Sequence, residues 1–232
     1  MTDRIPTQAV TELLADLVRE RESTDVFSRL VRDCRQDLGA DAVALLVTTA
    51  HHGLELLSAT SHRAAELEVY QAQQRTGPCV DVTRSGEALG AVGSDDIVAR
   101  WPDVGRAIVE AGFLAVHAFP MTWRGHTIGG LNVFRGSPDP LDTQSSAVAQ
   151  NFADIATLAL VQPDELTQDE LDERVETALA GRVVIEQAKG VLVQTLDLEL
   201  SEAYERLVDQ ALRQGTTVTE AARRVIRDAQ HT

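Results

Sequence analysis

The residue pattern of the chain changes near residue 162. Before this point, short runs rich in branched apolar residues alternate with glycine-containing turns, whereas after it both signals almost vanish and apolar residues recur at helical spacing. Strands in successive hairpins with helices between them are typical of an α+β domain with an antiparallel sheet. The sequence therefore predicts an α+β domain over residues 1–162 and a small all-helical domain over residues 163–232.

The first part carries two hairpin signals and several helical segments. The paired runs lie at 41–49 with 54–61 and at 113–121 with 126–136, and a short further strand is expected at 88–93. Apolar residues at helical spacing predict helices over 9–38 (broken at 23–25), 62–74, 100–112 and 145–161. These elements predict an antiparallel sheet with helices between and around its strands.

The second part predicts three helices, of which the first is the longest. They are expected at about 171–192, 201–214 and 219–229. The long helix holds Lys189, the only lysine among 21 basic residues. Arg182 and Lys189 are seven residues apart and so project from nearly the same side, with Glu186 between them at ion-pairing distance from both. A solvated row of ion pairs and a binding face are both compatible with this spacing.

Two glycines lie beside these two cations. Gly181 precedes Arg182 and Gly190 follows Lys189, and each costs roughly 1 kcal/mol relative to alanine inside a helix. A glycine allows another backbone or a phosphate to approach closely, and an adjacent lysine would then act as a point charge on that ligand. A tight crossing with another helix of the same chain explains Gly190 equally well.

The segment from Leu171 to Ile226, with the unbroken run IEQAKG at 185–190, resembles the ANTAR domain. The resemblance implies a three-helix module that binds paired stem-loops in nascent transcripts and prevents formation of a terminator hairpin. Carried over by position, the implied RNA contacts are Arg182, Gln187, Lys189, Gly190, Tyr204, Arg206 and Arg223. Arginine and lysine suit phosphates, glutamine suits an unstacked base, and Tyr204 suits either base stacking or the domain core.

The first part resembles a GAF domain, which implies a sensory module that encloses a small molecule on one face of its sheet. The resemblance rests on the order of elements and on RTGPCVDVTRSG (75–86), DDIVARWP (95–102), AVHAFPM (115–121) and IGGLNVFRG (128–136). Cys79, Trp101 and His117 are the candidate ligand-binding residues. Each has a structural alternative: Cys79 as a small buried apolar residue, Trp101 as a packed lid, and His117 as a hydrogen-bonded histidine within the sheet.

Composition limits the classes of function. The net charge of −15 disfavours non-specific adhesion to nucleic acid or anionic membranes, although arginines gather between 206 and 227. Without a long apolar run or a signal-peptide pattern, the protein is expected to be cytoplasmic and not membrane-bound. No metal-ligand spacing or phosphate-binding loop appears, and the pattern identifies no cofactor. Leu171, Val175 and Ala178 suggest a helical seam for a homodimer.

Two alternatives to an RNA-binding regulator follow from other features. Some GAF domains reduce methionine sulfoxide with cysteines, and Cys34 and Cys79 make a cysteine-dependent reductase or redox sensor the main alternative. We nevertheless expect no enzymatic activity, because Cys34 lies on a predicted entry helix without an evident route to Cys79. A helix-turn-helix DNA binder is disfavoured, because the long first helix and the short third helix do not form a compact recognition pair.

Overall fold

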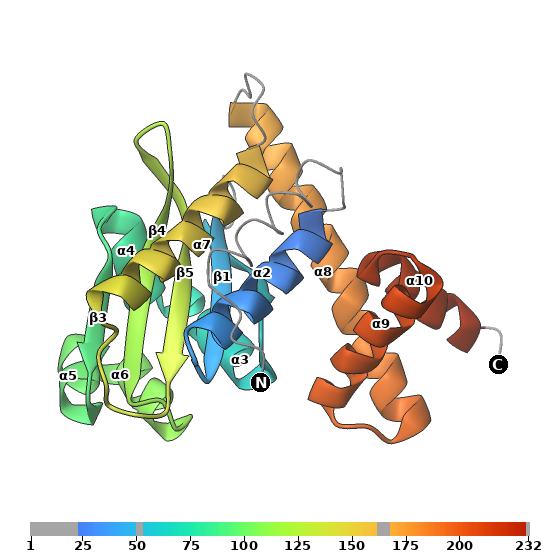
Figure 1. Cartoon of the computed structure of the whole chain (residues 1–232), viewed down its shortest axis with the longest axis horizontal. Helices are drawn as coiled ribbons and strands as arrows, with labels where there is room; N and C mark the ends of the chain where they lie inside the picture. Colours follow the sequence, from blue (N-terminus) through green and yellow to red (C-terminus); the bar gives the residue numbers. More distant parts are fainter. Residues whose placement is uncertain (1–22, 50–52, 162–167, 231–232) are drawn as a thin grey trace.

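The computed structural model describes residues 23–49, 53–161 and 168–230 (Figure 1). Five antiparallel strands form one sheet in the order β2-β1-β5-β4-β3. They are β1 (Ala42–Thr49), β2 (Gly53–Ala59), β3 (Leu89–Val92), β4 (Ala115–Trp123) and β5 (His126–Arg135). The predicted α+β class and both predicted hairpins, β1–β2 and β4–β5, are confirmed.

Helices cover both faces of the sheet, because successive strand residues point to opposite sides. Val43, Leu45 and Val47 of β1 pack toward α2 (Ser23–Asp37) and α7 (Thr143–Val161). Ala44 and Leu46 pack toward the opposite helical layer, and both sets are fully buried. That opposite layer contains α3 (His62–Gln74), α4 (Pro78–Ser85), α5 (Ser94–Arg100) and α6 (Pro102–Glu110). We call the two sides the α2/α7 face and the α3–α6 face.

Most helices of this domain occur where the apolar spacing predicts them. Two shorter helices, α4 and α5, were not predicted from this spacing. The helix expected after the break at 23–25 is α2, whose apolar residues are buried on the α2/α7 face. The part of that prediction over residues 9–22 lies outside the described residues. The helices α4 and α5 have 8 and 7 residues, which is too short for a repeating apolar pattern to appear.

The C-terminal region consists of three helices, as predicted. They are α8 (Gln168–Leu196), α9 (Leu200–Gln214) and α10 (Val218–Ala229). They enclose a core of their own, with Ile185, Ala188 and Leu192 of α8 packed against apolar residues of α9 and α10. Capping boxes begin both shorter helices, formed by Glu199 with Glu202 and by Thr217 with Glu220. No described helix is long and apolar enough to cross a membrane.

The long helix α8 also packs against the first domain (Figure 1). Val175 is 3% exposed within the apolar cluster of the α2/α7 face, and Leu179 packs against the same cluster. The predicted domain boundary at 162–163 lies outside the described residues. Of the expected dimer seam, Val175 is buried within a single copy, and the side chains of Leu171 and Ala178 lie outside the described part.

Shortening Val175 tests this attachment of α8. We expect Val175→Ala to lower the free energy of unfolding by about 2 kcal/mol, because it removes two buried methyl groups and leaves a small cavity. Urea unfolding followed by circular dichroism measures the change. Val183→Ala is the matched control: its side chain lies on the same helix at 52% exposure, so its effect should stay within about 0.5 kcal/mol. Equal effects of the two variants would contradict docking of α8 in solution.

Candidate functional site

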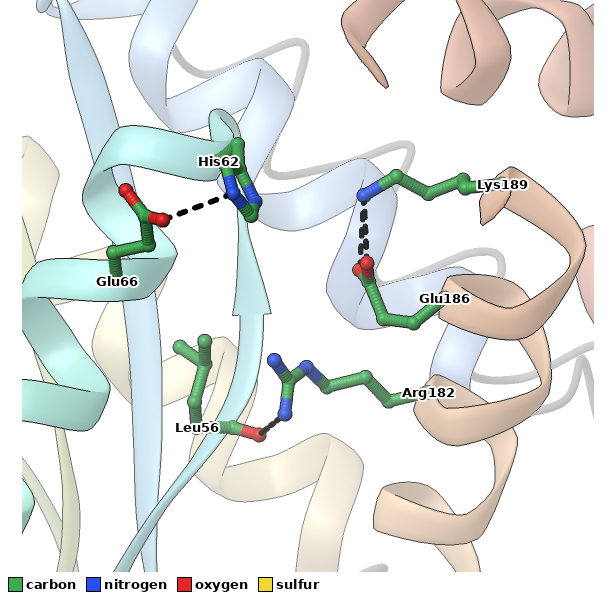
Figure 2. Close-up of polar contacts among 6 residues, drawn as sticks. All are labelled: Leu56, His62, Glu66, Arg182, Glu186 and Lys189. Atoms are coloured by element: carbon green, nitrogen blue, oxygen red, sulfur yellow. Dashed lines mark hydrogen bonds and ion pairs between the residues drawn. The ribbon is translucent and has the colours of Figure 1, made fainter. Parts of the chain in front are cut away.

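The lysine singled out in the sequence is almost enclosed. Lys189 is 9% exposed, and its Nζ donates hydrogen bonds to both carboxylate oxygens of Glu186, at 3.0 and 2.9 Å. The same Nζ lies 6.0 Å from the centre of the Tyr204 ring on α9, at the outer limit of a cation–π contact. Figure 2 shows the side chains of Glu186 and Lys189 extending together from α8 toward the first domain. The ammonium is therefore satisfied within the chain.

The neighbouring cation, Arg182, reaches the sheet of the first domain. Its Nη1 donates a 3.1 Å hydrogen bond to the backbone carbonyl of Leu56 on β2, a strand at one edge of the sheet (Figure 2). Burial lowers the pKa of the Arg182 guanidinium, and the nearby carboxylates of Glu186 and Glu55 oppose that shift. Arg182 thus pairs with a carbonyl that the edge strand would otherwise leave unbonded.

Gly190 and Gln187 form the open part of the same helix. Both are exposed, and a Cβ added to Gly190 would meet no described atom within 4 Å. A tight crossing with another described helix, one of the two explanations of Gly190, is therefore wrong. What remains is room for a molecule outside the described chain to approach the helix backbone.

The other three predicted RNA contacts lie on α9 and α10. Tyr204 is half-buried and packs against the C-terminal core, which supports its structural alternative. Arg223 is exposed on α10. Arg206 is exposed in a shallow hollow of about 390 Å³, whose other lining residues are Leu196, Leu198, Glu202, Glu205 and Asp209. Three carboxylates around one arginine make this hollow a poor site for phosphate.

The three candidate ligand-binding residues of the first domain do not lie together. Cys79 and Trp101 are buried on the α3–α6 face. His117 pairs with Val133, which points to the α2/α7 face, so His117 lies on that opposite side of the sheet. Its Nε2 accepts a 3.3 Å hydrogen bond from the backbone N–H of Leu141, and burial, followed by the charge of Arg135, lowers its pKa. The geometry supports His117 as a hydrogen-bonded structural histidine.

The α3–α6 face holds a buried polar network that sequence reasoning missed. Glu68, Gln71 and Asn132 are each 0% exposed. Asn132 Nδ2 donates to Glu68 Oε1 at 2.7 Å, Gln71 Nε2 donates to the other carboxylate oxygen, and Gln71 Oε1 accepts from the backbone N–H of Cys79 at 3.1 Å. Asn132 Oδ1 has no hydrogen-bond partner among the described residues. In the sequence, this network is indicated by Asn132, a polar residue within the apolar run LNVF (131–134).

Burial sets the acid–base behaviour of this network. It raises the pKa of Glu68 to about 8, while the hydrogen bonds from Asn132 and Gln71 act in the opposite direction. Burial also raises the pKa of the Cys79 thiol, and the adjacent Glu68 raises it further. Trp101, on the same face, donates from Nε1 to Asp81 at 2.7 Å. The face thus combines an apolar cluster with a few oriented polar groups.

The two cysteines are separated by the sheet. Cys34 is buried on the α2/α7 face and Cys79 on the α3–α6 face, and each is 0% exposed. Burial raises the pKa of both thiols, so neither favours the thiolate that a reductase needs for attack. This arrangement counts against a Cys34–Cys79 redox pair. Among the described residues, no three or more His, Cys, Asp or Glu side chains are placed so that they could hold a metal ion.

Two family models match the chain, one after the other. A family model described as GAF domain matches residues 22–160, and one described as ANTAR domain matches residues 173–226. The search of curated proteins gave no match.

Solved GAF domains share the fold of the first part. One from an Acinetobacter phosphoenolpyruvate-protein phosphotransferase is 9% identical, with a TM-score of 0.52 over 78% of this chain and 97% of that one. A phycocyanobilin-bound GAF domain from a cyanobacterial phytochrome is 12% identical, with a TM-score of 0.54 over 69% of this chain and 96% of that one. At such identities the likeness shows the fold alone.

The buried carboxyl of Glu68 should make stability depend on pH. Between its ordinary pKa of 4.5 and the folded value of about 8, the unfolded chain loses a proton that the folded chain keeps. The free energy of unfolding should therefore fall as pH rises through this window. Glu68→Gln should remove the slope and stabilise the protein above pH 8 by on the order of 4 kcal/mol.

Urea unfolding at several pH values between 5 and 9, roughly spanning the two pKa values, measures this slope. Glu110→Gln, at an exposed position on α6, is the control and should keep the slope of the unchanged protein. A slope that persists in Glu68→Gln would show that another group carries it.

Proposed function

The chain belongs to the GAF-domain family and carries an ANTAR domain behind its GAF domain, and on this premise we propose that it is a signal-responsive transcription antitermination regulator. Its C-terminal helices bind stem-loops in nascent mRNA in the cytoplasm, and its GAF domain senses a small molecule. Two copies acting as a homodimer would present two such surfaces to paired stem-loops, which would strengthen binding without any new contact.

One observation carries the RNA-binding part of the proposal: the open strip of α8 at Gln187 and Gly190. A glycine inside a helix costs stability, and no described atom lies close enough to Gly190 to explain it. An exposed amide beside bare backbone suits an unstacked RNA base with its sugar-phosphate chain. On this interpretation, position 190 is a glycine because a larger side chain would keep RNA away from the helix.

The contact between Arg182 and Leu56 supplies a route for the signal. The side chain of Leu56 is buried in the apolar cluster of the α3–α6 face, while its carbonyl accepts from Arg182 on α8. A guanidinium nitrogen held by this carbonyl is not free for a phosphate, so the docked state of α8 offers RNA a weaker site. A small molecule that binds the docked and released states unequally would shift the population between them and thereby control RNA binding.

The function itself is tested with the full chain. RNA cross-linked to the purified protein is sequenced, and the recovered leader is transcribed in vitro with and without the protein. We expect paired stem-loops upstream of terminators to be enriched and read-through of the terminator to increase. Recovery of duplex DNA or of RNA without stem-loops would contradict the proposal.

Gly190→Ala distinguishes the effect of the glycine on stability from its role in RNA binding. The change should raise the free energy of unfolding by roughly 1 kcal/mol, because it removes an interior glycine without a clash. It should also weaken binding to the recovered stem-loop by about tenfold, equivalent to 1.4 kcal/mol, because the added methyl group holds RNA away. Urea unfolding and mobility-shift titration measure the two effects. Leu212→Ala, 74% exposed on α9, should leave both nearly unchanged.

Glu55→Lys tests the route for the signal while leaving Arg182 in place. The new lysine on β2 should repel Arg182, weaken its bond to Leu56 and so increase RNA affinity several-fold. Glu66→Lys makes the same change of charge at an exposed position on α3 and controls for general attraction of RNA. Equal gains in the two variants would show that charge alone, and not release of Arg182, explains the effect.

A further inference from the structure

The group that α8 offers to an incoming RNA beside Gly190 is a carboxylate and not the expected ammonium. The side chain of Glu186 is 43% exposed, whereas that of Lys189 is 11% exposed and donates to both Glu186 oxygens. A phosphate that approached Lys189 would have to displace a carboxylate fixed on the same turn of helix. Repulsion between the two anions opposes that exchange.

A carboxylate in this position suits a hydrogen-bond donor. Each of its oxygens has two acceptor sites, so bonds from Lys189 leave acceptor capacity on both. The ion pair fixes the orientation of the carboxylate, which lowers the entropy lost when it binds a partner. Unstacked RNA bases are read through the hydrogen bonds of their Watson–Crick edges, and the open space at Gly190 lies one turn away.

We propose that Glu186 is a specificity-determining residue that reads a guanine in the loop of the RNA, and that Lys189 is the positioning residue that orients it. This inference rests on the proposed function. Guanine presents two adjacent donors, N1–H and the N2 amino group, which match the two oxygens of a carboxylate. Adenine and cytosine each place an acceptor nitrogen beside their amino group, and that acceptor would face the carboxylate unfavourably.

The experiment selects RNA with the full chain from hairpins that share one stem and carry a fully randomised loop. Unchanged protein should enrich guanine at one loop position, and Glu186→Gln should lose that preference. In the selected hairpin, replacing this guanine with inosine removes only the N2 amino group. The replacement should weaken binding of the unchanged protein about tenfold and change binding of Glu186→Gln much less.

A second variant separates positioning by Lys189 from a direct phosphate contact. Lys189→Met should reduce the preference for guanine over inosine while the dependence of affinity on salt stays unchanged. A phosphate contact would instead reduce the salt slope by about one unit and leave the guanine preference intact. Glu176→Gln, an exposed carboxylate near the beginning of α8, is the matched control and should behave as the unchanged protein. Thermal unfolding confirms that each variant is folded.

The outcomes keep the two proposals apart. Tighter binding by Glu186→Gln, or a guanine preference that survives in it, overturns the inference and shows that the carboxylate only repels RNA or pairs with Lys189. Hairpins selected without a guanine preference overturn the inference alone. A full chain that enriches no hairpin overturns the proposed function, and the inference with it.

Discussion

The structure depends on one helix being part of two cores. Near its beginning, α8 places Val175 in the apolar cluster of the α2/α7 face, and ten residues later Ile185 begins its share of the C-terminal core. Between these anchors Arg182 bonds to the edge strand β2. Because backbone hydrogen bonds make a helix stiff, a displacement at one anchor moves the other. The two domains therefore interact through packing and a directed hydrogen bond, and not only through a covalent link.

The same helix explains how an acidic chain can recognise an anionic ligand. The net charge of −15 opposes any nucleic acid at long range, and the two prominent cations of α8 are engaged within the chain. Recognition by bulk positive charge is thus weak here, and more of the binding energy has to come from shape and from base contacts. In the proposed function, this second kind of recognition would use the bare backbone at Gly190, the carboxylate of Glu186 held by Lys189, and the exposed amide of Gln187.

Much of this architecture could be predicted from sequence, because periodicity reports which face of an element is buried. The hairpins, the three C-terminal helices and the resemblance carried by IEQAKG followed from local pattern. The environment of Lys189 did not, because its enclosure depends on Tyr204 of α9 as well as on Glu186. For His117 the structural role could be predicted but the face of the sheet could not: alternation along a strand gives two faces, and only packing against the helices decides which face a residue occupies. The network around Glu68 joins residues 64 positions apart, beyond any local pattern.

The position of that network bears on the route that we propose for the signal. Glu68 lies on α3, which packs on β1 and β2. The long helix α8 contacts the same two strands. Leu56 belongs to both contacts, with its side chain in the apolar cluster and its carbonyl bonded to Arg182. On the proposed route, a ligand that shifts α3 would need to displace only the edge strand, and not the central strands, to weaken the hydrogen bond between Leu56 and Arg182. Edge strands are paired on one side only, so β2 moves at less cost than the central strands β1, β5 and β4.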